Sequence, residues 1–212
     1  MHAHLVQLDI AWEDRGENFR RTDALLAASR DRLHPGDLVV LPEMFDTGFS
    51  FRLAITADRD GATLAFLRQL ARTYNITLQG SRTVVSASGR GLNRCTVVAP
   101  SGEVLVEYDK IHPFSFGKEP EYFDAGSRVV PYPWTCDGST LIVCPSICYD
   151  LRFPELYREG LRQGAEVFAL GANWPTPRKI HRVALGVARA IENQAYVLCV
   201  NRAGNDPHLH YA

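Results

Sequence analysis

The sequence has no long hydrophobic run, and no apolar stretch approaches the ~20 residues that a membrane-spanning helix needs. The N-terminal segment MHAHLVQLDIAWED lacks the basic start of a signal peptide and reaches Asp9 after a short apolar run. Neither sign of charge dominates, because 23 Lys and Arg face 24 Asp and Glu, for a net charge of −1. The sequence therefore offers no strongly basic surface for nucleic acid. These absences predict a cytoplasmic protein that binds neither membrane nor nucleic acid.

Cysteine is scarce, and its spacing is irregular. The five cysteines are Cys95, Cys136, Cys144, Cys148 and Cys199. An odd number without a CxxC pair is a poor basis for a disulfide framework and suits a reducing compartment. The sequence also lacks a phosphate-binding loop, a dinucleotide fingerprint and a metal-ligand cluster, since its two His-x-His pairs lie near opposite ends of the chain. We therefore expect no cofactor and no metal.

What the sequence does contain is enough apolar material for a core, because 46% of its residues are hydrophobic and 22% are charged. Short apolar runs alternate with amphipathic helical patterns, without repeats or long linkers. Strands are expected at residues 5–10, 37–41, 76–87, 94–99, 104–108, 140–147, 167–172 and 195–201. Helices are expected at residues 19–33, 64–74 and 155–163, and from Thr176, as the capping residue, to 191. This alternation predicts an α/β fold in one domain spanning residues 1–212, with sheets covered by helices on one face and packed together on the other.

Three reactive residues occupy equivalent positions in this pattern. Glu43, Lys110 and Cys148 each come just after the C-terminal end of an apolar strand, which is where α/β proteins usually place ligands. If the strands are aligned, the three side chains converge on one cleft. A thiol nucleophile, a cation and a carboxylate that moves protons together suit nucleophilic catalysis.

Six segments carry a family resemblance. LPEMFDTGF at 41–49, YDKIH at 108–112 and SICYDLRFPE at 146–155 together resemble the nitrilase superfamily of carbon–nitrogen hydrolases. ANWPTPR at 172–178, ARAIENQAYV at 188–197 and NRAG at 201–204 resemble its omega-amidase-like branch. The resemblance covers the whole chain and implies a four-layer α-β-β-α sandwich that forms a homodimer. Members of this superfamily usually continue well beyond the point where this sequence ends, so strands that complete a sheet are expected to be missing at the C-terminus.

The resemblance also implies catalytic roles. Cys148 is expected to be the nucleophile, Glu43 the general base and Lys110 the third member of the triad. A second glutamate is expected in the loop GKEPEYFDAG, seven residues before the glycine that ends it. That count gives Glu119, with Glu121 as the alternative because the loop varies in length.

The chemistry of amide hydrolysis gives these residues a consistent use. Attack of the Cys148 thiolate on a carbonyl creates an oxyanion, for which the Lys110 ammonium and the backbone N–H of Tyr149 are natural donors. The ammonium also favours the thiolate electrostatically. Glu43 takes the thiol proton, passes it to the departing ammonia and then activates water to hydrolyse the thioester.

Further residues are expected to support the nucleophile or to shape the substrate pocket. Asp150 and Arg152 are expected to brace the turn at Cys148. The substrate-binding candidates are Phe45, Phe116, Tyr122, Tyr149, Asn173, Trp174 and Arg178. Of these, Arg178 is a candidate partner for a substrate carboxylate.

The leading hypothesis is hydrolysis of the terminal amide of a small dicarboxylic acid monoamide, of the 2-oxoglutaramate or 2-oxosuccinamate type. An aliphatic amidase, a carbamoylase or a nitrilase that uses the same residues is the alternative, because specificity depends on pocket contacts of about 1–3 kcal/mol each. An inactive, truncated family member is the non-enzymatic alternative. A papain-like Cys–His protease is disfavoured, because no histidine lies in a comparable motif and His112 simply neighbours Lys110.

Overall fold

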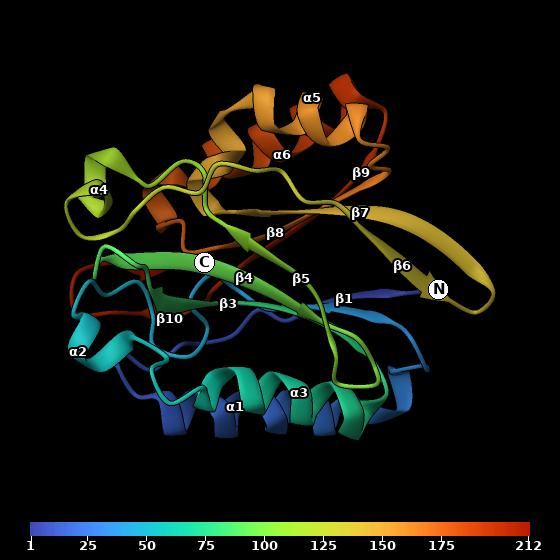
Figure 1. Cartoon of the computed structure of the whole chain (residues 1–212), viewed down its shortest axis with the longest axis horizontal. Coiled ribbons are helices and arrows are strands. Elements are labelled where there is room, and N and C mark those ends of the chain that lie inside the picture. Colours follow the sequence, from blue (N-terminus) through green and yellow to red (C-terminus); the bar gives the residue numbers. More distant parts are fainter.

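The computed structural model describes residues 1–212 and consists of two β-sheets stacked face to face between two pairs of helices (Figure 1). Helices α1 (Arg15–Ala28) and α3 (Ala62–Tyr74) cover the outer face of one sheet. Helices α5 (Pro154–Arg162) and α6 (Lys179–Asn193) lie on the outer side of the other. The predicted four-layer α-β-β-α sandwich is confirmed.

Each half of the chain builds one sheet. The first sheet runs in chain order through β1 (Ala3–Leu5), β2 (Leu38–Val40), β3 (Thr77–Val85), β4 (Gly91–Val98) and β5 (Val104–Asp109). The second contains β6 (Tyr132–Cys136), β7 (Ser139–Ile147), β8 (Val167–Ala172) and β9 (Tyr196–Asn201). The short helices are α2 (Leu53–Thr56) and α4 (Glu119–Tyr122), and a small pair is formed by β10 (Gly204–Asn205) and β11 (His210–Tyr211).

The side chains of strand β2 pack in two different apolar cores. Its side chains alternate across the sheet, so Leu38 and Val40 pack in the larger apolar cluster, which includes residues of both sheets. Val39 and Leu41 pack in the smaller cluster with residues of α1 and α3. Because β2 is buried on both faces, it reads as a continuous apolar run.

A glycine brings the two sheets together next to the expected cleft. A Cβ atom on Gly171 of β8 would lie 2.5 Å from the carbonyl oxygen of Leu41, a distance that real side chains do not adopt. Only glycine therefore lets the end of β8 approach the segment that leads from β2 to Glu43. Residues that follow these two strands are thereby placed side by side.

Some predicted boundaries differ from the structure. The strand expected at residues 5–10 is β1 at residues 3–5, paired with β2 from Ala3↔Leu38 to Leu5↔Val40. The pairing is short because β2 soon reaches Pro42, which has no N–H to donate. The helix expected up to residue 33 ends at Ala28 and is followed by a 3-10 turn. Strand β6 was not predicted.

The start and the exposed face of α6 also differ from expectation. Thr176 does not cap the helix, because it begins a 3-10 turn before α6 and its hydroxyl donates to the carbonyl of His210. The apolar stripe of α6 is exposed: Ile180, Val183, Val187 and Ile191 are 51–73% accessible. Helical spacing shows that these residues share a face but not which way that face points.

No helix in the structure is both long enough and apolar enough to cross a membrane. The single-domain assignment and the expectation of further C-terminal strands stay predictions.

Candidate active site

Cys148 sits at a sharp turn between β7 and α5. It begins a 3-10 turn, Cys148–Arg152, with φ of +47°, a left-handed conformation that is uncommon for a residue other than glycine. Such a conformation costs on the order of 1–3 kcal/mol and persists where the surrounding structure holds it in place. The residue is 8% exposed and lines a cavity.

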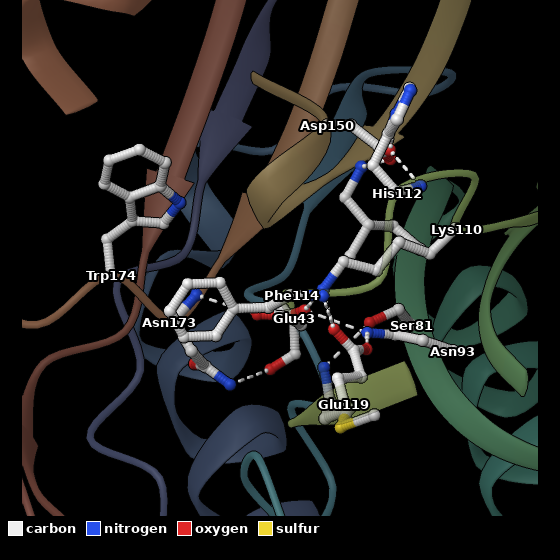
Figure 2. A network of polar contacts seen from close by, with 12 residues as sticks. Glu43, Ser81, Asn93, Lys110, His112, Phe114, Glu119, Asp150, Asn173 and Trp174 are labelled. Carbon is white, nitrogen blue, oxygen red and sulfur yellow. Dashed lines mark hydrogen bonds and ion pairs between the residues drawn. The ribbon is translucent and has the colours of Figure 1, made fainter. Parts of the chain in front are cut away.

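Lys110 forms the centre of a buried polar group. Its Nζ donates to Oε1 of Glu43 and to Oε2 of Glu119, each at 2.8 Å, and lies between the two carboxylates in Figure 2. All three side chains are at most 1% exposed. Residues 43, 110 and 119, far apart in the sequence, therefore meet at one point below the cavity.

The structure distinguishes between the two candidates for the second glutamate. Glu119 is buried against Lys110, whereas Glu121 is exposed on the same short helix, α4. The backbone N–H of Phe114 also donates to Glu119, and the N–H of Glu119 donates to the carbonyl of Phe114. These reciprocal bonds close the loop that carries Glu119 against the end of the lysine segment.

Further donors hold Glu43 in place. The side-chain amide of Asn93 donates to Oε1 of Glu43 at 2.8 Å, and the backbone N–H of Asn173 donates to Oε2 at 3.1 Å. The side-chain amide of Asn173 donates to the Glu43 carbonyl at 2.9 Å. Figure 2 shows Asn93 and Asn173 approaching Glu43 from different elements. The carboxylate is thus fixed from β4 and from the segment after β8.

Burial and two charged neighbours act on the pKa of the Cys148 thiol. Burial raises the pKa of Cys148 well above its ordinary value, and the carboxylate of Glu43 adds to this effect while Lys110 opposes it. Burial and Glu43 therefore favour the protonated thiol, and Lys110 favours the thiolate. For Lys110, burial alone lowers the pKa, but Glu119 and Glu43 outweigh that effect and keep the side chain a cation. Burial also raises the pKa of Glu119, against the opposing charge of Lys110.

The cavity above this group has a volume of about 260 Å³ and a largely apolar wall. Its lining consists of Glu43, Phe49, Phe114, Phe116, Gly117, Cys148, Tyr149, Arg152, Asn173, Trp174, Pro175, Arg178, Leu209 and Tyr211. A cavity of this size suits a small molecule.

Two arginines stand out in the apolar wall. The guanidinium carbon of Arg152 lies 4.8 Å from the Trp174 ring centroid, and that of Arg178 lies 4.9 Å from the Phe116 ring centroid. Neither forms an ion pair with a carboxylate of the protein; Arg152 instead contacts a ring nitrogen of His181 at 3.3 Å. The wall thus offers two cations whose hydrogen-bonding capacity is available to a ligand.

Most of the predicted pocket residues line the cavity, but two do not. Phe45 is fully buried in the smaller core, with its ring centroid 6.4 Å from that of Phe19, because the chain turns at Met44 (φ +45°) and directs it toward α1 and α3. Tyr122 stacks on Phe51 outside the cavity, with 5.1 Å between centroids. Both assignments as pocket residues were wrong.

Other site residues were assigned differently or were missed. Asp150 braces the turn as expected, but Arg152 lines the cavity. Asn93, Phe49 and Tyr211 were not predicted. Asn93 lies in β4 but comes just before the strand expected at residues 94–99, and only its polarity at a buried position could have drawn attention to it.

Comparison with known proteins places this geometry in a family. The carbon-nitrogen hydrolase family model matches residues 3–212. The chain belongs to the carbon-nitrogen hydrolase family. The family and enzyme class expected from the sequence are thereby confirmed.

Among the relatives of this carbon-nitrogen hydrolase is the omega-amidase YafV of Yersinia enterocolitica, which is 36% identical over 98% of this chain and 76% of the relative. The 2-oxoglutaramate amidase of Bacillus subtilis is 31% identical over 98% of this chain and 78% of that relative. The crystal structure of XC1258 from Xanthomonas campestris, a CN-hydrolase superfamily protein with an arsenic adduct in its active site, superposes with a TM-score of 0.87 at 36% identity. That match covers 100% of this chain and 81% of XC1258.

Proposed function

We propose that this carbon-nitrogen hydrolase cleaves the terminal amide of a small dicarboxylic acid monoamide, of the 2-oxoglutaramate or 2-oxosuccinamate type, into the acid and ammonia. The observation that carries the proposal is the buried Glu43–Lys110–Glu119 group next to Cys148, beneath a small cavity that also holds two arginines. The names of the relatives, omega-amidase and 2-oxoglutaramate amidase, support the same substrate class.

The first half of the reaction forms a thioester. As the sulfur of Cys148 bonds to the amide carbon, the thiol proton passes to Glu43, which is the acceptor required because burial favours the protonated thiol. The Lys110 ammonium and the backbone N–H of Tyr149 stabilise the oxyanion. When the C–N bond breaks, Glu43 returns the proton to nitrogen and ammonia leaves.

The second half regenerates the enzyme. Glu43 takes a proton from water, the resulting hydroxide bonds to the thioester carbon, and the C–S bond breaks. The proton then returns to the sulfur of Cys148 and the carboxylic acid leaves. Glu119 keeps Lys110 oriented throughout, through its 2.8 Å ion pair.

In this proposal the arginines of the cavity explain how the carboxylate end of the substrate is bound. A carboxylate prefers a guanidinium because the planar fork of donors matches its two oxygens. Arg178 and Arg152 line the cavity that Cys148 also lines, and the protein provides neither with a carboxylate partner. In this proposal Arg178 binds the distal carboxylate, while Asn173 and Trp174 shape the wall near the amide.

The test is ammonia release from 2-oxoglutaramate, glutamine and a simple aliphatic nitrile, measured side by side. The proposal predicts preferential release from 2-oxoglutaramate. Preference for the nitrile or for an uncharged amide would instead make the protein a nitrilase or an aliphatic amidase, and no release from any amide by the folded protein would indicate an inactive family member.

The remaining expectations belong to the same proposal. The reaction as written uses no cofactor and no metal. The five free cysteines suit a cytoplasmic location.

The exposed stripe of α6, which contains Ile180, Val183, Val187 and Ile191, is the face we propose for homodimer formation. Sedimentation equilibrium of the native protein and of Val187→Glu tests that assignment, since the substitution is expected to yield monomers.

A further inference from the structure

The carboxylate of Asp150 joins the two segments that carry Lys110 and Cys148. Its Oδ2 accepts hydrogen bonds from the Tyr108 hydroxyl at 2.7 Å and from the backbone N–H of Ile147 at 2.9 Å. Its Oδ1 accepts from the backbone N–H of His112 at 3.0 Å and contacts Nδ1 of the same histidine at 2.8 Å. Figure 2 shows the Asp150–His112 contact beside the Lys110 segment.

The residues that donate to Asp150 lie close to Lys110 and Cys148 in the sequence. Tyr108 and His112 flank Lys110 two residues to either side, and Ile147 immediately precedes Cys148. One carboxylate therefore bonds to a residue on either side of Lys110 and to the backbone that leads into the strained turn at Cys148. A carboxylate has about four lone-pair positions, and all four are used here.

The surroundings make this arrangement rigid. Asp150 is fully buried and Tyr108 is 1% exposed, so water does not compete for the bond between them. The ring of His112 stacks on Phe153, with 3.7 Å between centroids and 4° between planes. Phe153 in turn donates its backbone N–H to the carbonyl of Asp150.

We propose that Asp150 is a positioning residue for catalysis, acting through Tyr108 and His112 to fix Lys110 relative to the thiol of Cys148. The inference rests on the proposed function, because it concerns the same nucleophile. A displacement of about 1 Å between reacting groups can cost on the order of 100-fold in rate, so a clamp between their two segments contributes directly to turnover.

The test compares two buried tyrosines, of which only Tyr108 donates to Asp150; its hydroxyl also accepts from the backbone N–H of Ile111 at 3.2 Å. Tyr108→Phe removes one bond from the clamp. Tyr157→Phe removes a hydroxyl contact with Ser146 at 3.2 Å, from an equally buried tyrosine that makes no hydrogen bond with Asp150. We expect Tyr108→Phe to lower kcat about tenfold with KM changed less than twofold, and Tyr157→Phe to leave both within twofold.

A second readout needs no substrate. The rate at which iodoacetamide alkylates Cys148 is measured across pH, because the profile reports how Glu43 and Lys110 face the thiol. Tyr108→Phe is expected to displace this profile toward higher pH, since a less well placed Lys110 favours the thiolate less; Tyr157→Phe is expected to leave it unchanged. A purely structural role would lower the melting temperature of both variants and displace neither profile.

The outcomes separate this inference from the proposed function. If the wild-type protein hydrolyses no amide but Tyr108→Phe displaces the alkylation profile, the clamp stands and the proposed function fails. If Tyr108→Phe and Tyr157→Phe behave alike in both assays, the clamp is overturned. Asp150→Asn replaces one acceptor oxygen with an NH2 group, which then faces at least one of the donors. In folded protein, we expect this variant to lower kcat and to displace the alkylation profile more than Tyr108→Phe does.

Discussion

Lys110 and Glu119 form an ion pair of 2.8 Å, Nζ to Oε2, in a part of the protein closed to solvent. Burying either charge alone would be costly, so each requires the other. Because Glu43 binds the same ammonium, the position of the base depends on a residue 76 positions away in the sequence. The loop that carries Glu119 is therefore part of the catalytic group rather than a surface connection.

Substitution of the two glutamates of α4 tests this relationship. Glu119→Gln is expected to lower kcat/KM for the amide substrate by about 100-fold or more, because it removes the partner that orients a buried lysine. Glu121→Gln changes the same side chain two residues away at an exposed position and should stay within twofold of wild type. Equal effects of the two changes, in proteins shown by circular dichroism to be folded, would contradict the role of Glu119.

The arginine assignment predicts a change confined to anionic substrates. Arg178→Met is expected to lower kcat/KM for 2-oxoglutaramate by about 10–100-fold, the range for a lost hydrogen bond to a charged group. Hydrolysis of a neutral aliphatic amide of similar length should change little. Lys179→Met makes the same kind of change at the neighbouring exposed lysine and is the matched control. An equal loss with both substrates would indicate that Arg178 shapes the wall without binding the carboxylate.

The sequence shows why the catalytic centre was predictable and part of the pocket was not. Glu43 and Lys110 follow strands of the first sheet and Cys148 follows a strand of the second, and the stacking of the two sheets brings these strand ends together whatever the intervening loops do. Phe45 is only two residues from Glu43, yet the left-handed turn at Met44 sends it into the opposite core. Nothing in the local pattern distinguishes a residue that lines a cavity from one that lies beneath it.

The same reasoning explains the errors on α6 and β1. Regular spacing identified the apolar stripe of α6, but the side facing the protein is formed instead by residues such as Arg189, whose buried guanidinium donates to the carbonyl of Leu151. The apolar run at residues 5–10 predicted a longer strand, but pairing ends where its partner β2 ends. Contacts between distant segments decided both outcomes.

Asp46 predicts a pH dependence of stability. Burial raises the pKa of its carboxyl to about 6, despite a hydrogen bond from Thr63 and the nearby Arg15. A raised acid pKa means that the folded state binds the proton more tightly, so the contribution to stability is present below the unfolded pKa and is lost as pH rises toward 6. The loss attributable to Asp46 is up to about 3 kcal/mol.

Urea unfolding of wild type and Asp46→Asn between pH 4 and pH 8 measures this contribution. The stability of the wild type relative to the variant should fall as pH rises to about 6 and then level off. A difference that is constant across the range would show that Asp46 titrates alike in the folded and unfolded states.

The reaction scheme also predicts that metal removal has no effect. Dialysis against EDTA should leave ammonia release within experimental error of the untreated enzyme, because the thiol, the carboxylates and the ammonium supply every proton and electron pair. A loss of activity that is restored by a divalent cation would contradict the scheme.

The most direct test of the account is ammonia release from 2-oxoglutaramate by the wild-type protein and by Cys148→Ala, at equal concentrations of folded protein. The account predicts steady release by the wild type and none above background for the variant, with unchanged circular dichroism. Release by Cys148→Ala at a rate comparable to the wild type would contradict the central claim that this carbon-nitrogen hydrolase acts through a thioester on Cys148.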